Sequence, residues 1–106
     1  MTEHDIQNQI REVLPLYGFS VFRGNVGKVK MTDGRYFDTG LPRGWPDLMA
    51  IKAGKIYFVE VKGPGGKLRP EQEDFLQFAR TTMGCPAGVA RSVEDALEIC
   101  GIKRAG

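Results

Sequence analysis

Two acidic residues and a lysine lie in short motifs that a β-hairpin would bring together. Asp47 ends the motif Trp45-Pro46-Asp47, and the motif Glu60-Val61-Lys62 follows further along the chain. Between them, residues 48–51 and 56–59 are hydrophobic and partly β-branched or aromatic, and they flank a short polar turn. Whether the turn is the two residues 53–54 or the four residues 52–55, paired residue numbers sum to 107. The pattern therefore predicts that Asp47 lies opposite Glu60.

This register predicts a site for chemistry on phosphate. Directly opposed side chains share a face, with Cβ atoms roughly 4.5–5.5 Å apart, and strand alternation places Lys62 on the face of Glu60. Two ionised carboxylates at that distance repel by roughly 3 kcal/mol at an effective dielectric near 20. A divalent cation would reverse the sign, and carboxylate oxygens favour Mg²⁺ or Mn²⁺. Lys62 would then lie where it could position or activate the attacking water.

Two alternatives stay open for these three residues. They could form an exposed strand face on which Lys62 only neutralises the acids. A slip of one residue in the register would also send Asp47 and Glu60 to opposite faces. Either outcome would remove the basis for a metal site.

The same motifs resemble a known nuclease signature. Gly44-Trp45-Pro46-Asp47-Leu48 and Phe58-Val59-Glu60-Val61-Lys62 are similar to the PD-(D/E)xK pattern, and more narrowly the chain resembles small stand-alone VRR-NUC domains of the phage and bacterial type. That family has an early Glu on its first helix, matched by Glu3, and a Gln on the helix after the Glu-x-Lys strand, matched by Gln72. The resemblance covers nearly the whole chain.

The resemblance implies a restriction-endonuclease-like α/β fold, with a mixed β-sheet flanked by helices in a single domain over residues 1–106. It also implies Mg²⁺ or Mn²⁺ dependence and hydrolysis of phosphodiester bonds in branched or structured DNA. Small members resemble dimeric Holliday-junction resolvases, so a homodimer is expected. Two alternatives are a restriction-type, nicking or flap nuclease, and a non-catalytic DNA-binding module on the same fold.

The candidate site residues have different support. As a hypothesis, Asp47, Glu60, the Val61 carbonyl and Glu3 would bind metal, while Asp47, Glu60, Lys62 and Gln72 would act in catalysis. Only the resemblance suggests Glu3 as a ligand, because an acid in the first turn of a helix also complements the helix dipole. Gln72 either faces inward, where it would orient a water or Lys62, or lies on the surface.

Positive charge is concentrated around this candidate site. Residues 18–70 contain ten Lys or Arg against four acids, although the whole chain carries a formal charge of only +2. A phosphate-backbone binder requires such a distribution, and a solvated basic face is the alternative. The candidate DNA-binding residues are Arg43, Lys67, Arg69, Lys28 and Lys30. Trp45 either packs beneath the Pro46 turn or stacks on an unpaired base.

Length and composition limit the remaining possibilities. A chain of 106 residues predicts one hydrophobic core. No apolar run approaches the roughly 20 residues that span a membrane, and the polar start does not resemble a signal peptide. We therefore expect no membrane partner and an intracellular, cytoplasmic location, in a bacterium or a phage-infected host. Cys85 and Cys100 lack metal-binding spacing, so no zinc site is predicted.

Local signals predict the elements that position the site. A helix begins after Thr2, and a strand over 19–22 and a hairpin over 28–31 and 35–37 with an Asp33-Gly34 turn precede the hairpin of the site. A helix from Pro70, a weak strand over 87–90 and a helix from Ser92 follow. The predicted order is αβββββαβα, with three helices around a mixed sheet as an α/β sandwich.

Overall fold

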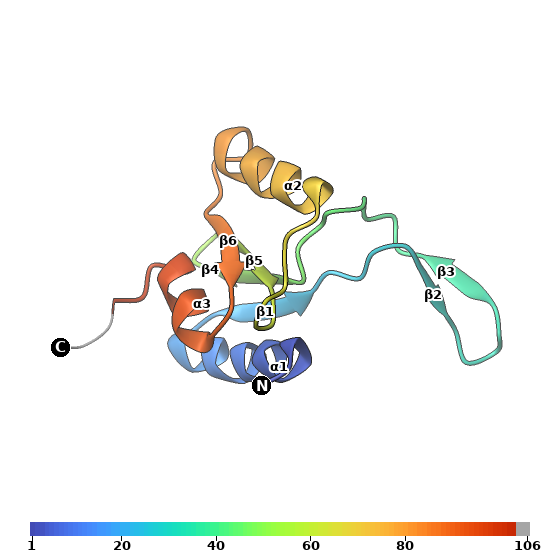
Figure 1. The fold of residues 1–106 in the computed structure, drawn as a ribbon, viewed down its shortest axis with the longest axis horizontal. Coiled ribbons are helices and arrows are strands. Elements are labelled where there is room, and N and C mark those ends of the chain that lie inside the picture. The colour runs from blue at the N-terminus through green and yellow to red at the C-terminus, as the bar shows by residue number, and fades with distance from the viewer. Residues whose placement is uncertain (104–106) are drawn as a thin grey trace.

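Helices and strands follow one another in the order that the sequence predicts (Figure 1). A computed structural model describes residues 1–103. The helices are α1 (Glu3–Val13), a 3₁₀ turn η1 (Leu14–Tyr17), α2 (Pro70–Thr81) and α3 (Val93–Ile99). The strands are β1 (Ser20–Arg23), β2 (Lys28–Lys30), β3 (Tyr36–Asp38), β4 (Leu48–Lys52), β5 (Lys55–Val61) and β6 (Ala87–Ala90).

The helix ends follow local side-chain chemistry. The Asp5 N–H donates to the Thr2 hydroxyl over 3.1 Å, and the Thr2 N–H donates to the Asp5 carboxylate over 3.0 Å, which completes a capping box at α1. Ser92 caps α3 by accepting from the N–H of Asp95 over 3.1 Å. Pro70 is the first residue of α2, where a missing N–H costs nothing. All three helix starts confirm the sequence prediction.

Four of the strands form one mixed sheet in the order β1-β4-β5-β6. Its β1–β4 and β4–β5 pairs are antiparallel and its β5–β6 pair is parallel. Helices α1 and α3 cover one face, where they pack on alternate residues of β4 and β5 such as Leu48, Val59 and Val61. Helix α2 lies over the opposite face (Figure 1), where Phe75 contacts Phe58 at 5.3 Å between ring centroids. The α/β prediction with a mixed sheet between helices is confirmed.

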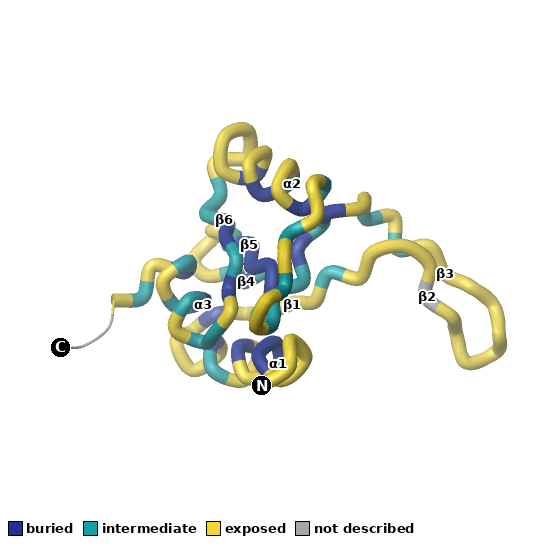
Figure 2. Tube along the Cα trace, viewed as in Figure 1, coloured by how far each residue is buried: buried dark blue, intermediate teal, exposed yellow. Residues whose placement is uncertain are grey.

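Burial is greatest in the central strands and in α1, as Figure 2 shows. Ile10, Leu14, Leu48, Val59 and Val61 have no exposed side-chain surface in this core. Because strand residues alternate between faces, Phe58, Glu60 and Lys62 point away from this core and toward α2. No helix within residues 1–103 is both long enough and apolar enough to cross a membrane.

The predicted hairpin of β2 and β3 is present, but it does not join the main sheet. The two strands pair only with each other, with Lys28 opposite Asp38 and Lys30 opposite Tyr36. Figure 1 shows this hairpin projecting from the body at the end opposite α3. The sequence prediction located both strands and the Asp33-Gly34 turn, but it did not separate them from the sheet.

Candidate active site

The β4–β5 hairpin has the register that the sequence predicts. Leu48 pairs with Val59 and Lys52 pairs with Lys55, so the turn is the two-residue version and paired numbers sum to 107. Ala53 and Gly54 have φ angles of 51° and 77°, which is the backbone of a type I′ turn. The slipped register that would separate the two acids is therefore absent from this hairpin.

Asp47 is the residue just before β4, and its side chain reaches across to β5. The Val61 N–H donates to Asp47 Oδ2 over 2.8 Å, which fixes the carboxylate beside the Glu60-Val61-Lys62 motif. The backbone carbonyl of Asp47 also accepts from the Gly24 N–H over 2.8 Å. Asp47 is thus held from both sides, by β5 and by the chain that leaves β1.

Glu60 is buried in an environment that disfavours its charge. Its residue surface is 2% exposed, and the atom Oε2 is buried without a hydrogen-bond partner among residues 1–103. The pKa of Glu60 is raised from 4.5 to about 9, chiefly by burial, and the neighbouring Asp47 carboxyl adds to the rise. Lys62 lowers the pKa of Glu60, whereas Glu3 raises it. Asp47, Lys62 and Glu3 therefore lie close enough to influence the ionisation of Glu60.

A buried carboxylate oxygen without a partner is costly unless a cation or a donor completes it. Glu60 Oε2 is such an atom, and it lies beside a second carboxylate, that of Asp47. Two hard oxygen donors of this kind fit Mg²⁺ or Mn²⁺. Among the side chains of residues 1–103, no cluster of three or more His, Cys, Asp or Glu is arranged to hold a metal ion. The candidate donor set among these side chains is therefore the two carboxylates of Asp47 and Glu60.

Glu3 lies near this pair without joining it as a third grouped ligand. The first turn of α1 packs against Gly63, where an added Cβ would lie 3.2 Å from the Glu3 nitrogen. That contact places the start of α1 beside the end of β5, as the family resemblance implied. The Glu3 residue is exposed, and its part in binding metal stays a prediction.

Gln72 is buried, so the surface alternative is wrong. It is 5% exposed, and its Oε1 accepts from the Arg69 N–H over 2.9 Å as part of the cap of α2. This capping role was not predicted from the sequence, although a Gln at the third helical position is a known signal for it. Its side chain also lines the pocket that contains Asp47.

A pocket of about 380 Å³ opens beside Asp47. Asn25, Arg43, Arg69, Glu71 and Gln72 contribute polar groups to its wall. The two arginines are among the predicted DNA contacts, whereas no role was predicted for Asn25 or Glu71. An ion pair of 3.6 Å joins Arg69 to Glu71 at the rim.

Glycines allow the close packing that shapes this pocket. An added Cβ at Gly24 would lie 2.4 Å from the Pro46 oxygen and 2.6 Å from the Trp45 ring. At Gly44 the same atom would lie 2.2 Å from the Glu71 oxygen. Neither position therefore has room for a side chain, and an isolated Gly beside a predicted strand is the sequence signal for such a close approach.

Trp45 packs rather than standing free beside the site. Its ring contacts Phe58 at 5.7 Å and Phe75 at 4.8 Å between centroids. These contacts favour the packing interpretation, because the indole supports the turn at Pro46 from the α2 side of the sheet. Its Nε1 is buried without a hydrogen-bond partner in the described part of the chain.

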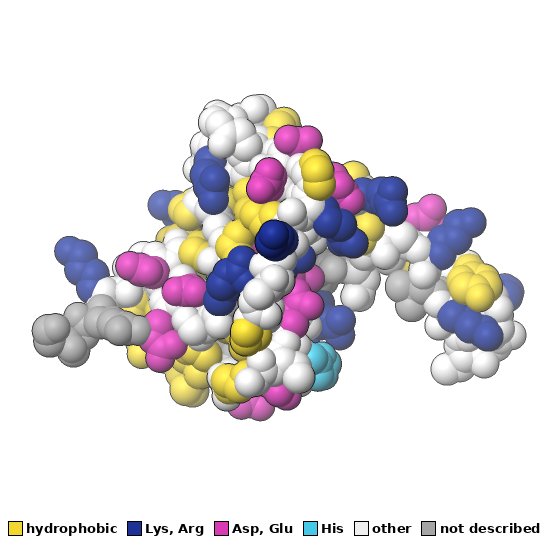
Figure 3. Space-filling model, in the orientation of Figure 1, with side chains coloured by type: hydrophobic (Ala, Val, Ile, Leu, Met, Phe, Trp, Pro, Cys, Tyr) yellow, Lys and Arg dark blue, Asp and Glu magenta, His cyan; other side chains and the backbone are white. Residues whose placement is uncertain are grey.

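The predicted DNA-binding residues lie in two groups. Arg43 and Arg69 line the pocket, with the exposed Lys67 nearby in sequence, while Lys28 and Lys30 lie on the separate hairpin. Figure 3 shows Lys and Arg side chains both on the projecting hairpin and across the middle of the same face. The structure thus brings together Asp47, Glu60 and Lys62, and it places Lys28 and Lys30 away from them.

Comparison with known proteins agrees with this geometry. The family model of the VRR-NUC domain matches residues 2–94. A search of curated proteins finds no match to the chain. The matched segment contains α1, both hairpins, α2 and β6.

Proposed function

This chain belongs to the VRR-NUC domain family, whose members are nuclease domains of the PD-(D/E)xK superfamily, and from that membership we propose that it is a metal-dependent, structure-specific DNA endonuclease. The observation that carries the proposal is the unpartnered carboxylate oxygen of Glu60, buried beside Asp47 and within electrostatic reach of Lys62. Packing alone provides no reason to bury an acid in this way. A divalent cation bound both by this acid and by a substrate phosphate would provide such a reason.

Asp47 and Glu60 would hold the cation, with the Val61 carbonyl and Glu3 as further candidate ligands. When bound, Mg²⁺ or Mn²⁺ supplies Lewis-acid stabilisation of charge on the phosphate and lowers the pKa of a water. Superfamily members generally use divalent metals, in agreement with this donor set. The Val61 N–H keeps the Asp47 carboxylate oriented toward β5 in this arrangement.

Lys62 is proposed to position the water that attacks phosphorus in line with the leaving oxygen. Its ammonium would also offset the negative charge that builds on the phosphate oxygens as one P–O bond forms and the other breaks. Gln72 would orient Lys62 or that water, since its buried side chain lines the pocket beside Asp47. Arg43, Lys67 and Arg69 would bind neighbouring phosphates by charge.

The preferred substrate of this proposal is branched DNA, and the preferred assembly is a homodimer. Two sites related by a twofold axis could cut symmetric strands of a four-way junction, whereas a monomer would nick or trim. The resemblance to small stand-alone family members supports this version. Sedimentation at micromolar concentration should show a dimer, and a monomer alone would rule out the symmetric version in favour of a nicking or flap nuclease.

Cleavage of labelled DNA tests the proposal. The purified protein should cut a four-way junction with Mg²⁺ or Mn²⁺, should cut a linear duplex more slowly, and should be inactive in EDTA. Asp47→Asn keeps an oxygen for the Val61 N–H but removes the charge, and it should abolish cutting. Lys62→Gln should lower the single-turnover rate by about 100-fold or more, the scale of other lost electrostatic contacts in active sites.

The matched control is Asp74→Asn, an exposed acid on α2, which should cut as the wild type does. Folding of each variant is checked by circular dichroism. Undiminished cutting by folded Asp47→Asn would refute the assignment. DNA binding without cutting by the wild type under any metal would favour the non-catalytic module.

A further inference from the structure

The β2–β3 hairpin has no role in the chemistry proposed above and no packing that explains its form. Residues 25–38 are exposed at every position where burial is described, and Figure 2 shows the same along the projecting tube. A hairpin of two strands is marginally stable in water on its own. A surface of this kind is therefore a candidate for contact with another molecule.

The base of this hairpin is attached directly to the candidate active site. The Gly24 N–H donates to the Asp47 carbonyl on one side, and the Thr39 N–H donates to the Gly27 carbonyl over 2.9 Å to close the two strands. On the returning side, Gly44 lies against the first turn of α2. A ligand held by the hairpin would thus be positioned relative to Asp47.

The register divides the hairpin into two different faces. Lys28 and Lys30 lie two positions apart on β2, with Asp38 opposite Lys28 and Tyr36 opposite Lys30, so these four side chains share a face. Tyr36 is 65% exposed there. Phe37 and Met31 belong to the opposite face and are also exposed, and Arg35 lies opposite Met31. One face is therefore basic on balance, with two lysines and an aromatic ring against one acid, and the other is mainly apolar.

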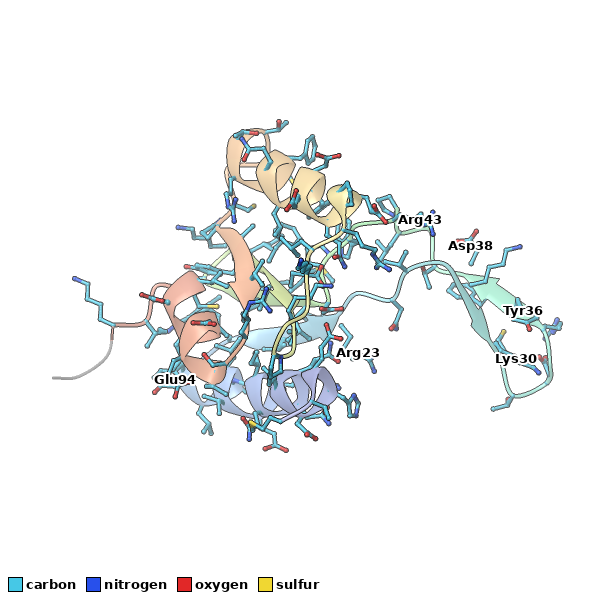
Figure 4. All side chains as sticks on the ribbon, viewed as in Figure 1. Arg23, Lys30, Tyr36, Asp38, Arg43 and Glu94 are labelled. Atoms are coloured by element: carbon cyan, nitrogen blue, oxygen red, sulfur yellow. The ribbon has the colours of Figure 1, made fainter. Side chains whose placement is uncertain are left out.

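Charge favours a polyanion as the ligand of the basic face. Residues 23–43 contain five Lys or Arg against two Asp, and the Arg35–Asp33 ion pair at 2.7 Å leaves four cations against one acid. Figure 4 shows Lys30 and Tyr36 on the hairpin and Arg43 on the segment that returns from it toward the body. The basic residues therefore continue from the hairpin to the pocket beside Asp47.

We infer that the β2–β3 hairpin is a DNA-binding arm that holds duplex DNA next to the scissile phosphate, with Lys28 and Lys30 on backbone phosphates and Tyr36 against the sugar–phosphate backbone between them. The inference rests on the proposed function, because it takes the DNA at Asp47 as given. A two-stranded β-ribbon fits the major groove of B-DNA. The enzyme would then need a duplex segment on the hairpin side of the cut.

Binding measured without cleavage tests this arm. Fluorescence anisotropy in EDTA follows a labelled four-way junction and a labelled linear duplex over a series of salt concentrations. Lys28→Gln with Lys30→Gln should weaken binding by about 10- to 100-fold at 0.1 M salt, because two phosphate contacts are lost. The plot of the logarithm of the DNA association constant against the logarithm of the salt concentration should become less steep, by about 2. Lys28→Arg with Lys30→Arg should retain the affinity.

The matched control removes the same charge at the other end of the molecule. Lys55 and Lys103 are exposed, and Lys55 lines a pocket with Gly101 and Ile102 beyond α3. Lys55→Gln with Lys103→Gln should leave affinity and salt slope near those of the wild type. An equal loss in this control would show that only total charge matters, and the arm would be rejected.

A second copy of the chain is the other possible partner, and it would use the apolar face. Met31→Ser with Phe37→Ser should leave DNA affinity and sedimentation unchanged if the arm binds DNA. Loss of dimers in this variant, with wild-type affinity in the lysine variant, would assign the hairpin to subunit contact instead. If the wild type cuts DNA and the double lysine variant binds DNA as tightly as the wild type, the DNA-binding arm is rejected and the proposed nuclease function stands. If the wild type neither binds nor cuts DNA, both proposals are rejected.

Discussion

At the scale of single residues, the site depends on an acid that the fold does not stabilise in its charged form. Glu60 is buried beside Asp47, so its ionisation is opposed by desolvation and by a like charge. The Lys62 ammonium offsets only part of that opposition, since the pKa of Glu60 remains near 9. Under the proposed function, a bound cation would remove this opposition to the charge of Glu60.

Replacing Glu60 with Gln should therefore stabilise the metal-free protein at alkaline pH. Because the folded pKa of about 9 exceeds the ordinary value of 4.5, the folded state keeps a proton that the unfolded chain releases between those values. Stability from this group is complete below about pH 4.5 and is lost as the pH rises toward 9. A tenfold change in an acid dissociation constant corresponds to about 1.4 kcal/mol of free energy. The free energy of unfolding of Glu60→Gln should therefore exceed that of the wild type by more than about 1 kcal/mol at pH 8.5.

Urea denaturation in EDTA at pH 5.5 and pH 8.5 measures this difference. The gain of Glu60→Gln over the wild type should be larger at pH 8.5 than at pH 5.5. Glu73→Gln, at an exposed position of α2, is the control and should follow the wild type at both values. A gain that does not change with pH would show that Glu60 is ionised in the folded protein throughout.

The sequence predicted the proximity of Asp47, Glu60 and Lys62 because hairpin register is a local property. The turn at Ala53 and Gly54 determines which residues face each other, and alternation then determines which share a face. The capping role of Gln72 is also local, because a helix that begins at Pro70 has Gln72 at its third position, where a Gln can cap the helix start. The burial of Gln72 could not be derived from the sequence, because it depends on how α2 packs on the sheet.

At the scale of elements, close glycine contacts join the loops around the pocket. The segment that returns from β3 passes α2 at Gly44, whose φ of 90° and missing side chain both permit the approach to the Glu71 carbonyl. Gly34, at the tip of the β2–β3 hairpin, has the same φ of 90° but nothing within 4 Å of an added Cβ. Comparing substitutions at the two glycines therefore distinguishes the cost of backbone strain from the cost of steric overlap.

Gly44→Ala should destabilise the protein far more than Gly34→Ala. In Gly34→Ala, the alanine must adopt the left-handed backbone conformation without any steric overlap. The free energy of unfolding should fall by about 1 kcal/mol. The Gly44 variant adds overlap with the backbone of α2 and should lose about 3 kcal/mol or more. Gly44→Ala should also lower cleavage in its remaining folded fraction, since Asp47 follows three residues later.

Urea denaturation compares the two variants, with cleavage measured well below each midpoint. Equal losses of stability would mean that the loop at Gly44 moves away from α2 without cost. That result would contradict the rigid packing of the pocket wall.

The order of the elements was predictable because each carries its own signals, such as the Thr2 and Ser92 caps and the Asp33-Gly34 turn. The separation of β2–β3 from the sheet was not predictable. It depends on which strands pair over long range, and β1 bonds to β4 rather than to β2. Local patterns contain no information about that choice.

At the scale of the whole molecule, positive charge is concentrated in the part of the chain that includes the projecting hairpin. The chain measures 51 × 32 × 30 Å, and the long axis runs from the end of α3 to the tip of the β2–β3 hairpin (Figure 1). Ten of its fifteen Lys and Arg lie in residues 18–70, which contain both hairpins. The sequence predicted this charge distribution directly, whereas the projecting shape that carries part of it required the structure.

The central claim is that a divalent cation lies between the carboxylates of Asp47 and Glu60. Anomalous diffraction from a crystal soaked in Mn²⁺ locates that ion without any assumption about substrate or activity. We predict a manganese peak bonded to both carboxylates, with Glu60 Oε2 no longer unpartnered. Density for manganese elsewhere, with no peak between these two residues, would contradict the claim.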